Sequence, residues 1–203
     1  MKMISVKKSD WAGAMEKAQK SFRLAGPVKA KKGHTFRELK NGEIPDLDYV
    51  ETRMSVKEVV LPQSEVMFTY SLDNEKEGHH ILEEMPFDET PRAAVGIRPY
   101  DAKAVEILKK NFITDDYIDP YFERRYENIT LVGMAENNPS SVNFSLSCGT
   151  GPFDESCLDI ILADAGDNYI GKVLTEKGEK FAAAAGFAEG DSGIEAKIAE
   201  LKE

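Results

Sequence analysis

The stretch from residue 93 to residue 134 constrains the fold more than any other part of the sequence, because strand and helix patterns alternate along it. The apolar run 93–97 is typical of a buried strand. Helical patterns follow at 101–111 and 120–126, and they lead into a second apolar run at 129–134. Strand, helix, helix, strand is the order of a βαβ unit, so this stretch predicts two parallel strands of an α/β sheet.

The segments on either side of this unit predict a mixed sheet with flanking helices. Apolar residues recur at helical spacing from Trp11 to Phe22, behind the capping pair Ser9-Asp10, and Asp101 is the expected N-cap of the helix at 101–111. The turn sequence Gly166-Asp167-Asn168 separates two apolar runs, which predicts an antiparallel pair. The expected elements are helices at 9–21, 176–185 and 192–202, short strands at 23–31, 34–40 and 66–70, and antiparallel strands at 158–163 and 169–174.

The chain length is sufficient for a real core. At 203 residues, a chain of this kind buries roughly 70% of the surface that its unfolded form exposes. We expect an N-terminal α+β lobe at 1–90 and an α/β lobe at 91–203 that pack together as one compact unit. The acidic segment 41–48 is expected to be an irregular loop, and the polar segment 71–80 an exposed loop.

The charge of the chain argues against two classes of partner. Lys and Arg number 26 and Asp and Glu number 36, which gives a formal net charge of −10. Nucleic acid and anionic lipid are therefore not expected to bind, because both require concentrated positive charge. No apolar run approaches the roughly 20 residues that cross a bilayer, and residues 1–10 lack an apolar signal segment. We expect a cytoplasmic protein whose two cysteines, Cys148 and Cys157, are free thiols.

Few residues form a recognisable chemical motif. His79 and His80 are adjacent, so they could hold a metal only with further ligands, and a solvated turn is the simpler interpretation. No local signature supports a cysteine nucleophile. The stretch from Cys148 to Pro152 has glycines at 149 and 151 around a threonine, which permits either close backbone approach to a ligand or a tight structural turn.

Several short stretches resemble one protein family, in order and at similar spacing along nearly the whole chain. They resemble the N-terminal region of sulfhydrogenase beta subunits and of the A subunit of anaerobic sulfite reductase, which are electron-transfer subunits with 4Fe-4S clusters. The stretches are Pro27-Val28-Lys29, Ser55 through Gln63, Gly96-Ile-Arg-Pro-Tyr-Asp101, Asp119-Pro-Tyr, Arg124-Arg125, Gly149-Thr-Gly-Pro152 before Leu158, and Thr175-Glu-Lys-Gly178.

The sequence departs from the family pattern at the cysteines that look suited to hold a cluster. At those four positions this chain has Tyr100, Glu136, Asn143 and Ser145, and Cys148 lies three residues beyond the last of them. A cubane cluster requires thiolates, so the resemblance implies that this region binds no cluster. It further implies that 4Fe-4S clusters belong to a downstream region or to a partner subunit.

Two functions from different classes remain open. In the first, the chain is either the N-terminal part of a longer electron-transfer subunit or a stand-alone relative. It is a docking domain, not catalytic alone, that orients an iron-sulfur or flavin subunit of a redox complex. In the second, the former cluster pocket binds or transforms a small molecule. In both, the candidate residues converge around one pocket, with no metal; they are Arg98, Tyr100, Glu136, Asn143, Ser145, Cys148, Gly149 and Gly151.

Overall fold

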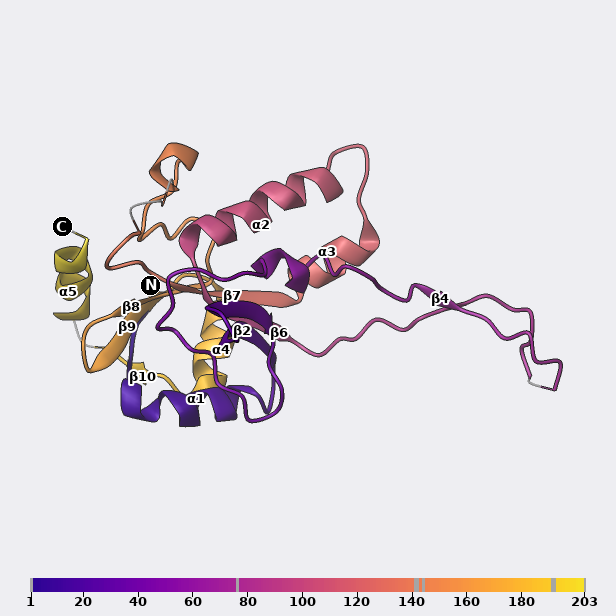
Figure 1. Ribbon diagram of the computed structural model, residues 1–203, viewed down its shortest axis with the longest axis horizontal. Helices are drawn as coiled ribbons and strands as arrows, with labels where there is room; N and C mark the ends of the chain where they lie inside the picture. The colour runs from indigo at the N-terminus through magenta and orange to yellow at the C-terminus, as the bar shows by residue number, and fades with distance from the viewer. Residues whose placement is uncertain (1, 76, 141–142, 144, 191–192, 203) are drawn as a thin grey trace.

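An eight-stranded mixed sheet forms the centre of the computed structural model, which describes residues 2–75, 77–140, 143, 145–190 and 193–202 (Figure 1). The strand order is β10-β1-β9-β8-β7-β6-β2-β3, with β2, β6, β7 and β8 parallel to one another. This confirms the expected α/β sheet. The strands are β1 (Lys2–Lys7), β2 (Arg23–Lys29), β3 (His34–Glu38), β6 (Arg92–Ile97), β7 (Ile129–Met134), β8 (Ile160–Asp164), β9 (Asn168–Val173) and β10 (Ala188–Glu189).

The predicted βαβ unit is present. Strands β6 and β7 are parallel neighbours, with Ala94 opposite Leu131, and α2 (Pro99–Phe112) and α3 (Pro120–Glu127) connect them. The expected antiparallel pair is β8 with β9, in which Leu162 lies opposite Gly171. Both confirmations follow from apolar runs whose side chains are buried on both faces of the sheet.

Helices cover both faces of the sheet and bury a separate core on each (Figure 1). On one face, α1 (Trp11–Ala18) and α4 (Glu176–Ala185) bury Met15 and Phe181 completely. The other face is covered by α2, α3 and α5 (Gly193–Leu201), and Val105 and Phe122 belong to that core. The short 3-10 helix η2 (Val56–Val59) lies on this second face, next to α2.

One local expectation is wrong, and one strand was missed. Helix α2 begins at Pro99 rather than after Asp101, so Asp101 lies in its first turn and Arg98 occupies the N-cap position. Proline fits the first position of a helix because the missing N–H is not needed there. The N-terminal residues form β1, which was not expected; it pairs with β9 and buries Ile4 and Val6 on one side.

The sheet joins residues from both expected lobes, since β1, β2 and β3 precede residue 90 and the other five strands follow it. The expected strand at 66–70 shortens to β4 (Phe68–Thr69), which pairs with β5 (Glu83–Glu84) outside the main sheet. This two-stranded ribbon extends far from the body of the protein (Figure 1).

Candidate functional site

The candidate residues meet at the carboxyl ends of β6 and β7. Arg98 follows β6 directly, and Glu136 lies two residues beyond the end of β7. The crevice outside the carboxyl ends of parallel strands is the usual place for ligands in open α/β sheets. The β6–β7 register shifts between Val95 and Ile97, so Gly96 forms a bulge with φ of 83° just before Arg98.

Arg98 and Glu136 form a buried ion pair. Their side chains are 8% and 7% exposed, and Arg98 Nε lies 3.8 Å from Glu136 Oε1. The Arg98 guanidinium also donates to the backbone carbonyls of Met134 and Ala135, each at 3.2 Å, and to that of Tyr49. The guanidinium lies over the Tyr49 ring at 4.3 Å, while the Tyr49 hydroxyl donates to the Gly96 carbonyl. Arg98 therefore fixes the strand ends to the 45–50 loop.

A polar network continues from Glu136 into the segment around Ser145. Asn143 Nδ2 donates to Glu136 Oε2 at 2.5 Å, and the Ser145 backbone N–H donates to Asn143 Oδ1 at 2.8 Å. The Thr150 hydroxyl donates to the Ser145 carbonyl at 3.0 Å, closing a turn in which Gly149 has φ of 72°. The turn at 149–151 is thus supported by its own hydrogen bonds, which agrees with its structural interpretation.

A cavity of about 440 Å³ lies over this network. Val50, Ala104 and Ile107 form part of its apolar wall. Five of the eight candidate residues line the cavity: Tyr100, Glu136, Asn143, Ser145 and Cys148. Arg98 lies behind Glu136, whereas Gly149 and Gly151 are not among the lining residues.

Sequence reasoning missed several residues of the site. Tyr49, Glu51, Ser55 and Lys57 come from a segment more than 40 residues before Tyr100, and all but Tyr49 line the cavity. No periodicity or motif connects that segment with the strand ends. Ser55 does lie in one of the stretches that resemble the family, and this is the one signal that pointed to it.

The environment favours the uncharged forms of three acidic groups. Burial, followed by the nearby Glu136 and Asp101 charges, raises the pKa of Tyr100 to about 12. Burial raises the pKa of Asp101 to about 6, although Lys57 and Arg98 oppose the change. Burial also raises the pKa of Glu136, against the opposing effects of Arg98 and Asn143. The Tyr100 hydroxyl therefore stays protonated at neutral pH, and Asp101 changes its charge near pH 6.

We expect Asp101→Asn to stabilise the protein above pH 6 and not below pH 4. Because the folded-state pKa is above the unfolded value, folding opposes ionisation, and the cost develops as pH rises from about 4 to 6. The gain in the free energy of unfolding should be about 1–2 kcal/mol at pH 7.5, since the N-terminus of α2 partly favours the charge. Urea denaturation at several pH values measures this gain, with exposed Asp115→Asn as control. A difference in the free energy of unfolding that does not change with pH would contradict this account.

Tyr100, Glu136, Asn143 and Ser145 do not fit a 4Fe-4S cluster. They provide a phenol, a carboxylate, an amide and a hydroxyl, while Fe–S clusters are held by thiolates. The Glu136 carboxylate is already paired with Arg98 and accepts a hydrogen bond from Asn143. Within the described ranges no three His, Cys, Asp or Glu residues come together in a geometry that could hold a metal ion. Cys148 is an exposed free thiol, and Cys157 is a free, partly buried one.

The fold and site define a three-layer α/β domain with a cavity at the carboxyl ends of its parallel strands. Its sequence is similar to "Sulfhydrogenase 2 subunit beta" of Pyrococcus furiosus, with 27% identity over 163 residues. The matched region covers 78% of this chain and 44% of the relative, so the chain spans less than half of the relative's length. No protein-family model matches the chain. In the described part of the chain, every helix is too short or too polar to cross a membrane.

Proposed function

We propose that this chain is a docking domain of the electron-transfer subunit of an iron-sulfur oxidoreductase, of the hydrogenase or sulfite reductase type, and acts in the cytoplasm. It holds no cluster at the site described above. Its partner is an iron-sulfur or flavin subunit, and any 4Fe-4S cluster belongs to that partner or to a downstream region. The similarity to a sulfhydrogenase beta subunit over most of this chain supports the assignment to a redox complex.

The polar network around Glu136 supports the docking role over a redox role for this domain. Arg98, which follows β6, binds Glu136 and the carbonyl of Met134 at the end of β7, and Asn143 binds Glu136. These contacts stabilise the loops that thiolates would otherwise tie to a cluster. A Tyr100 hydroxyl whose pKa is about 12 stays protonated at neutral pH and is a poor iron ligand. The site is therefore built to keep a shape without a metal.

Anaerobic reconstitution with iron and sulfide tests this proposal. We expect less than about 0.2 iron atoms per chain after desalting, and no broad visible absorption that bleaches on reduction, because the two thiols of the chain cannot form a four-thiolate site. A bacterial ferredoxin treated in parallel is the positive control, and Cys148→Ser should give the same low iron content as the wild type. Near-stoichiometric iron with a bleachable spectrum would refute the docking proposal and return electron transfer to this domain.

The cavity itself favours a second candidate function, the binding or conversion of a small molecule. It combines an apolar wall with the Tyr100 hydroxyl and with Asp101, whose pKa of about 6 suits proton transfer near neutral pH. Denaturing the purified protein and analysing the released small molecules by mass spectrometry separates the two functions. A stoichiometric compound that Tyr100→Phe fails to retain would favour the second function.

A further inference from the structure

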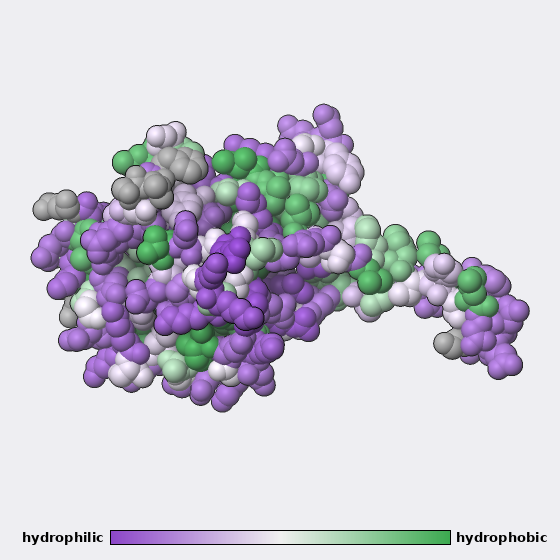
Figure 2. Space-filling view, viewed as in Figure 1, coloured by the Kyte–Doolittle hydropathy of each residue, from purple (hydrophilic) through white to green (hydrophobic). Residues whose placement is uncertain are grey.

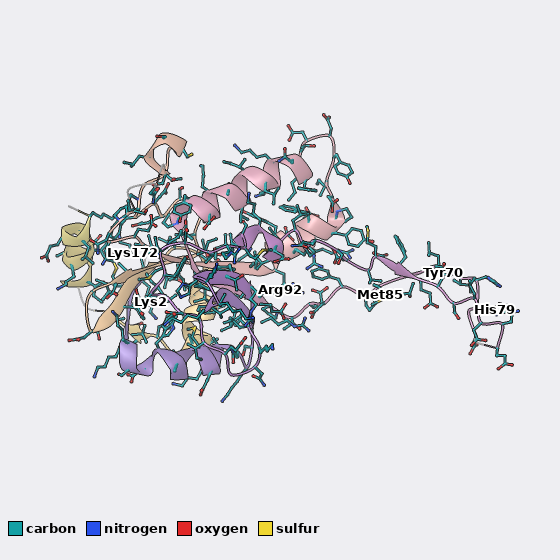
Figure 3. All side chains as sticks on the ribbon, viewed as in Figure 1. Lys2, Tyr70, His79, Met85, Arg92 and Lys172 are labelled. Atoms are coloured by element: carbon teal, nitrogen blue, oxygen red, sulfur yellow. The ribbon has the colours of Figure 1, made fainter. Side chains whose placement is uncertain are left out.

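The ribbon formed by β4 and β5 lies in the middle of a long arm at residues 63–90. Phe68 pairs with Glu84 and Thr69 with Glu83, and the pairing continues on both sides through backbone bonds from Met85 to Met67 and from His80 to Ser71. Figures 1 and 3 show the arm leaving the body, with Met85, Tyr70 and His79 progressively farther out. Two isolated strands have little stability of their own in water.

The arm exposes large apolar side chains to solvent. Six of them have exposed fractions of 48–66%: Val66, Phe68, Tyr70, Leu72, Ile81 and Leu82. Figure 2 shows apolar groups along this projection, next to the polar surface of its outer end. Large exposed apolar side chains gathered on one projection are typical of a binding site for another protein.

The arm also carries most of the net charge of the chain. Residues 63–90 contain eight acidic residues and one lysine, a net charge of −7 out of the −10 of the whole sequence. A strongly acidic, apolar element is repelled by anionic lipid and by the acidic surface of a second copy. Charge complementarity therefore favours a partner with a basic surface.

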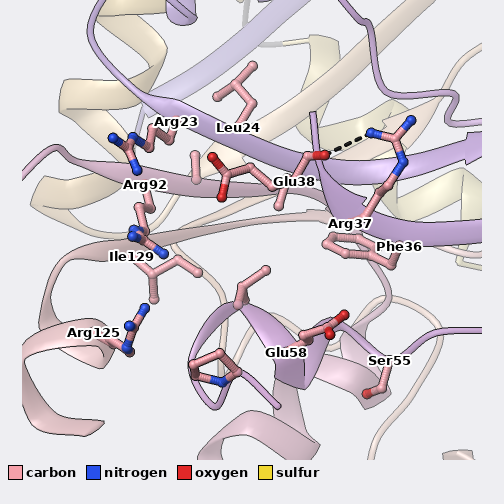
Figure 4. Close-up of a pocket in the computed structure, with 14 residues that line it drawn as sticks. Arg23, Leu24, Phe36, Arg37, Glu38, Ser55, Glu58, Arg92, Arg125 and Ile129 are labelled. Carbon is pink, nitrogen blue, oxygen red and sulfur yellow. Dashed lines mark hydrogen bonds between the residues drawn. The ribbon is translucent and has the colours of Figure 1, made fainter. Parts of the chain in front are cut away.

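The root of the arm is anchored to the amino ends of the parallel strands. Arg23 at the start of β2 binds Asp88 at 2.6 Å, and Arg92 at the start of β6 lies 3.6 Å from the same carboxylate. Arg125 of α3 binds Glu65 on the other strand of the arm. Figure 4 shows these three arginines side by side along a cavity of about 250 Å³. Both strands of the arm are thus held near the amino ends of the parallel strands, whereas the candidate site lies at the carboxyl ends.

We propose that the arm inserts into an apolar groove, rimmed by Lys and Arg, on a different protein subunit. This inference rests on the proposed function, because the subunit is taken to be the redox partner. It adds which surface of this chain binds that partner and the chemistry of the groove on the partner. The apolar side chains supply the buried area, and the acidic residues between them orient the arm on the basic rim. The arm leaves from the amino ends of the parallel strands, whereas the candidate-site cavity lies at their carboxyl ends.

Site-specific photo-cross-linking followed by affinity measurement tests the inference. A benzophenone amino acid at position 70 is introduced into the tagged full chain in its native host, and the cross-linked peptide is sequenced. The partner is then purified, and its affinity is measured for the wild type and for Tyr70→Ser/Leu72→Ser/Leu82→Ser. A matched control changes three exposed apolar residues of the body, Tyr117→Ser/Ile118→Ser/Leu146→Ser.

We expect the cross-link to reach a Lys- or Arg-rich apolar surface of a different polypeptide. The arm variant should bind at least about 30-fold more weakly, since three central apolar contacts are lost, and the control within about two-fold. Glu75→Lys/Glu77→Lys/Glu83→Lys should also weaken binding and reduce its salt dependence. Wild-type affinity for the arm variant, a cross-link only to a second copy, no cross-link, or flotation with phosphatidylglycerol vesicles would each overturn the inference.

The failure of this inference and that of the proposed function give different results. A redox partner that binds the arm variant as tightly as the wild type would leave the docking function standing on another surface. An arm-dependent partner without iron-sulfur or flavin centres would retain the arm as an interface and refute the electron-transfer assignment.

Discussion

Arg98→Ala should lower the free energy of unfolding by about 3–5 kcal/mol, because it removes one partner of a buried ion pair and leaves the other buried. The substitution also removes the donors for three backbone carbonyls, two at the end of β7 and one at Tyr49. Each of those carbonyls would lose a hydrogen bond at a buried site. Chemical denaturation monitored by circular dichroism at pH 7.5 measures the loss.

Two comparisons separate the buried charge from a general effect of losing an arginine. Exposed Arg53→Ala should change stability by less than about 0.5 kcal/mol. In a Glu136→Gln background, Arg98→Ala should cost about 1–2 kcal/mol less than in the wild type, because no unpaired carboxylate remains. Equal costs in the two backgrounds would mean that Arg98 acts only through its backbone hydrogen bonds.

The parallel core of this fold is predictable because its signals are local. The runs 93–97 and 129–134 are apolar without alternation, which is typical of strands buried on both faces, and a helix-length segment separates them. The N-terminal strand was missed for the opposite reason. Its two buried residues, Ile4 and Val6, alternate with exposed residues in a lysine-rich stretch, so its polar content concealed a period-two pattern.

The candidate site was only partly predictable, because its contacts join distant segments. A family resemblance singled out five residues that the structure places around one cavity. They are Tyr100, Glu136, Asn143, Ser145 and Cys148. Their function as a former cluster site stays a prediction. Tyr49, which packs on Arg98, is 49 residues away in sequence and carries no local signal. The sequence did not predict that residues 63–90 form one projecting arm. An apolar run does not reveal whether the rest of the protein will bury it or leave it exposed to solvent.

Gly96→Ala should destabilise the protein by about 2–4 kcal/mol and disturb the site. Gly96 has φ of 83°, a region that costs an alanine about 1–2 kcal/mol. A Cβ at this position would lie 2.6 Å from Leu47 Cδ2 and 3.3 Å from Pro27 Cδ, so the surrounding loop must also shift. The Gly96 carbonyl accepts the Tyr49 hydroxyl, and the bulge directs Arg98 toward Glu136, so both contacts depend on this backbone conformation.

Gly42→Ala is the matched control, because Gly42 has φ of 81° and nothing lies within 4 Å of an added Cβ. It should cost only the backbone strain of about 1 kcal/mol, and the difference between the two variants measures the crowding around the bulge. The Gly96→Ala variant should also lose the pH-dependent gain from Asp101→Asn, because the burial of Asp101 depends on the position of Arg98 and of the first turn of α2. Equal destabilisation by the two alanines, with the pH dependence of Asp101→Asn unchanged, would show that the bulge does not position the site.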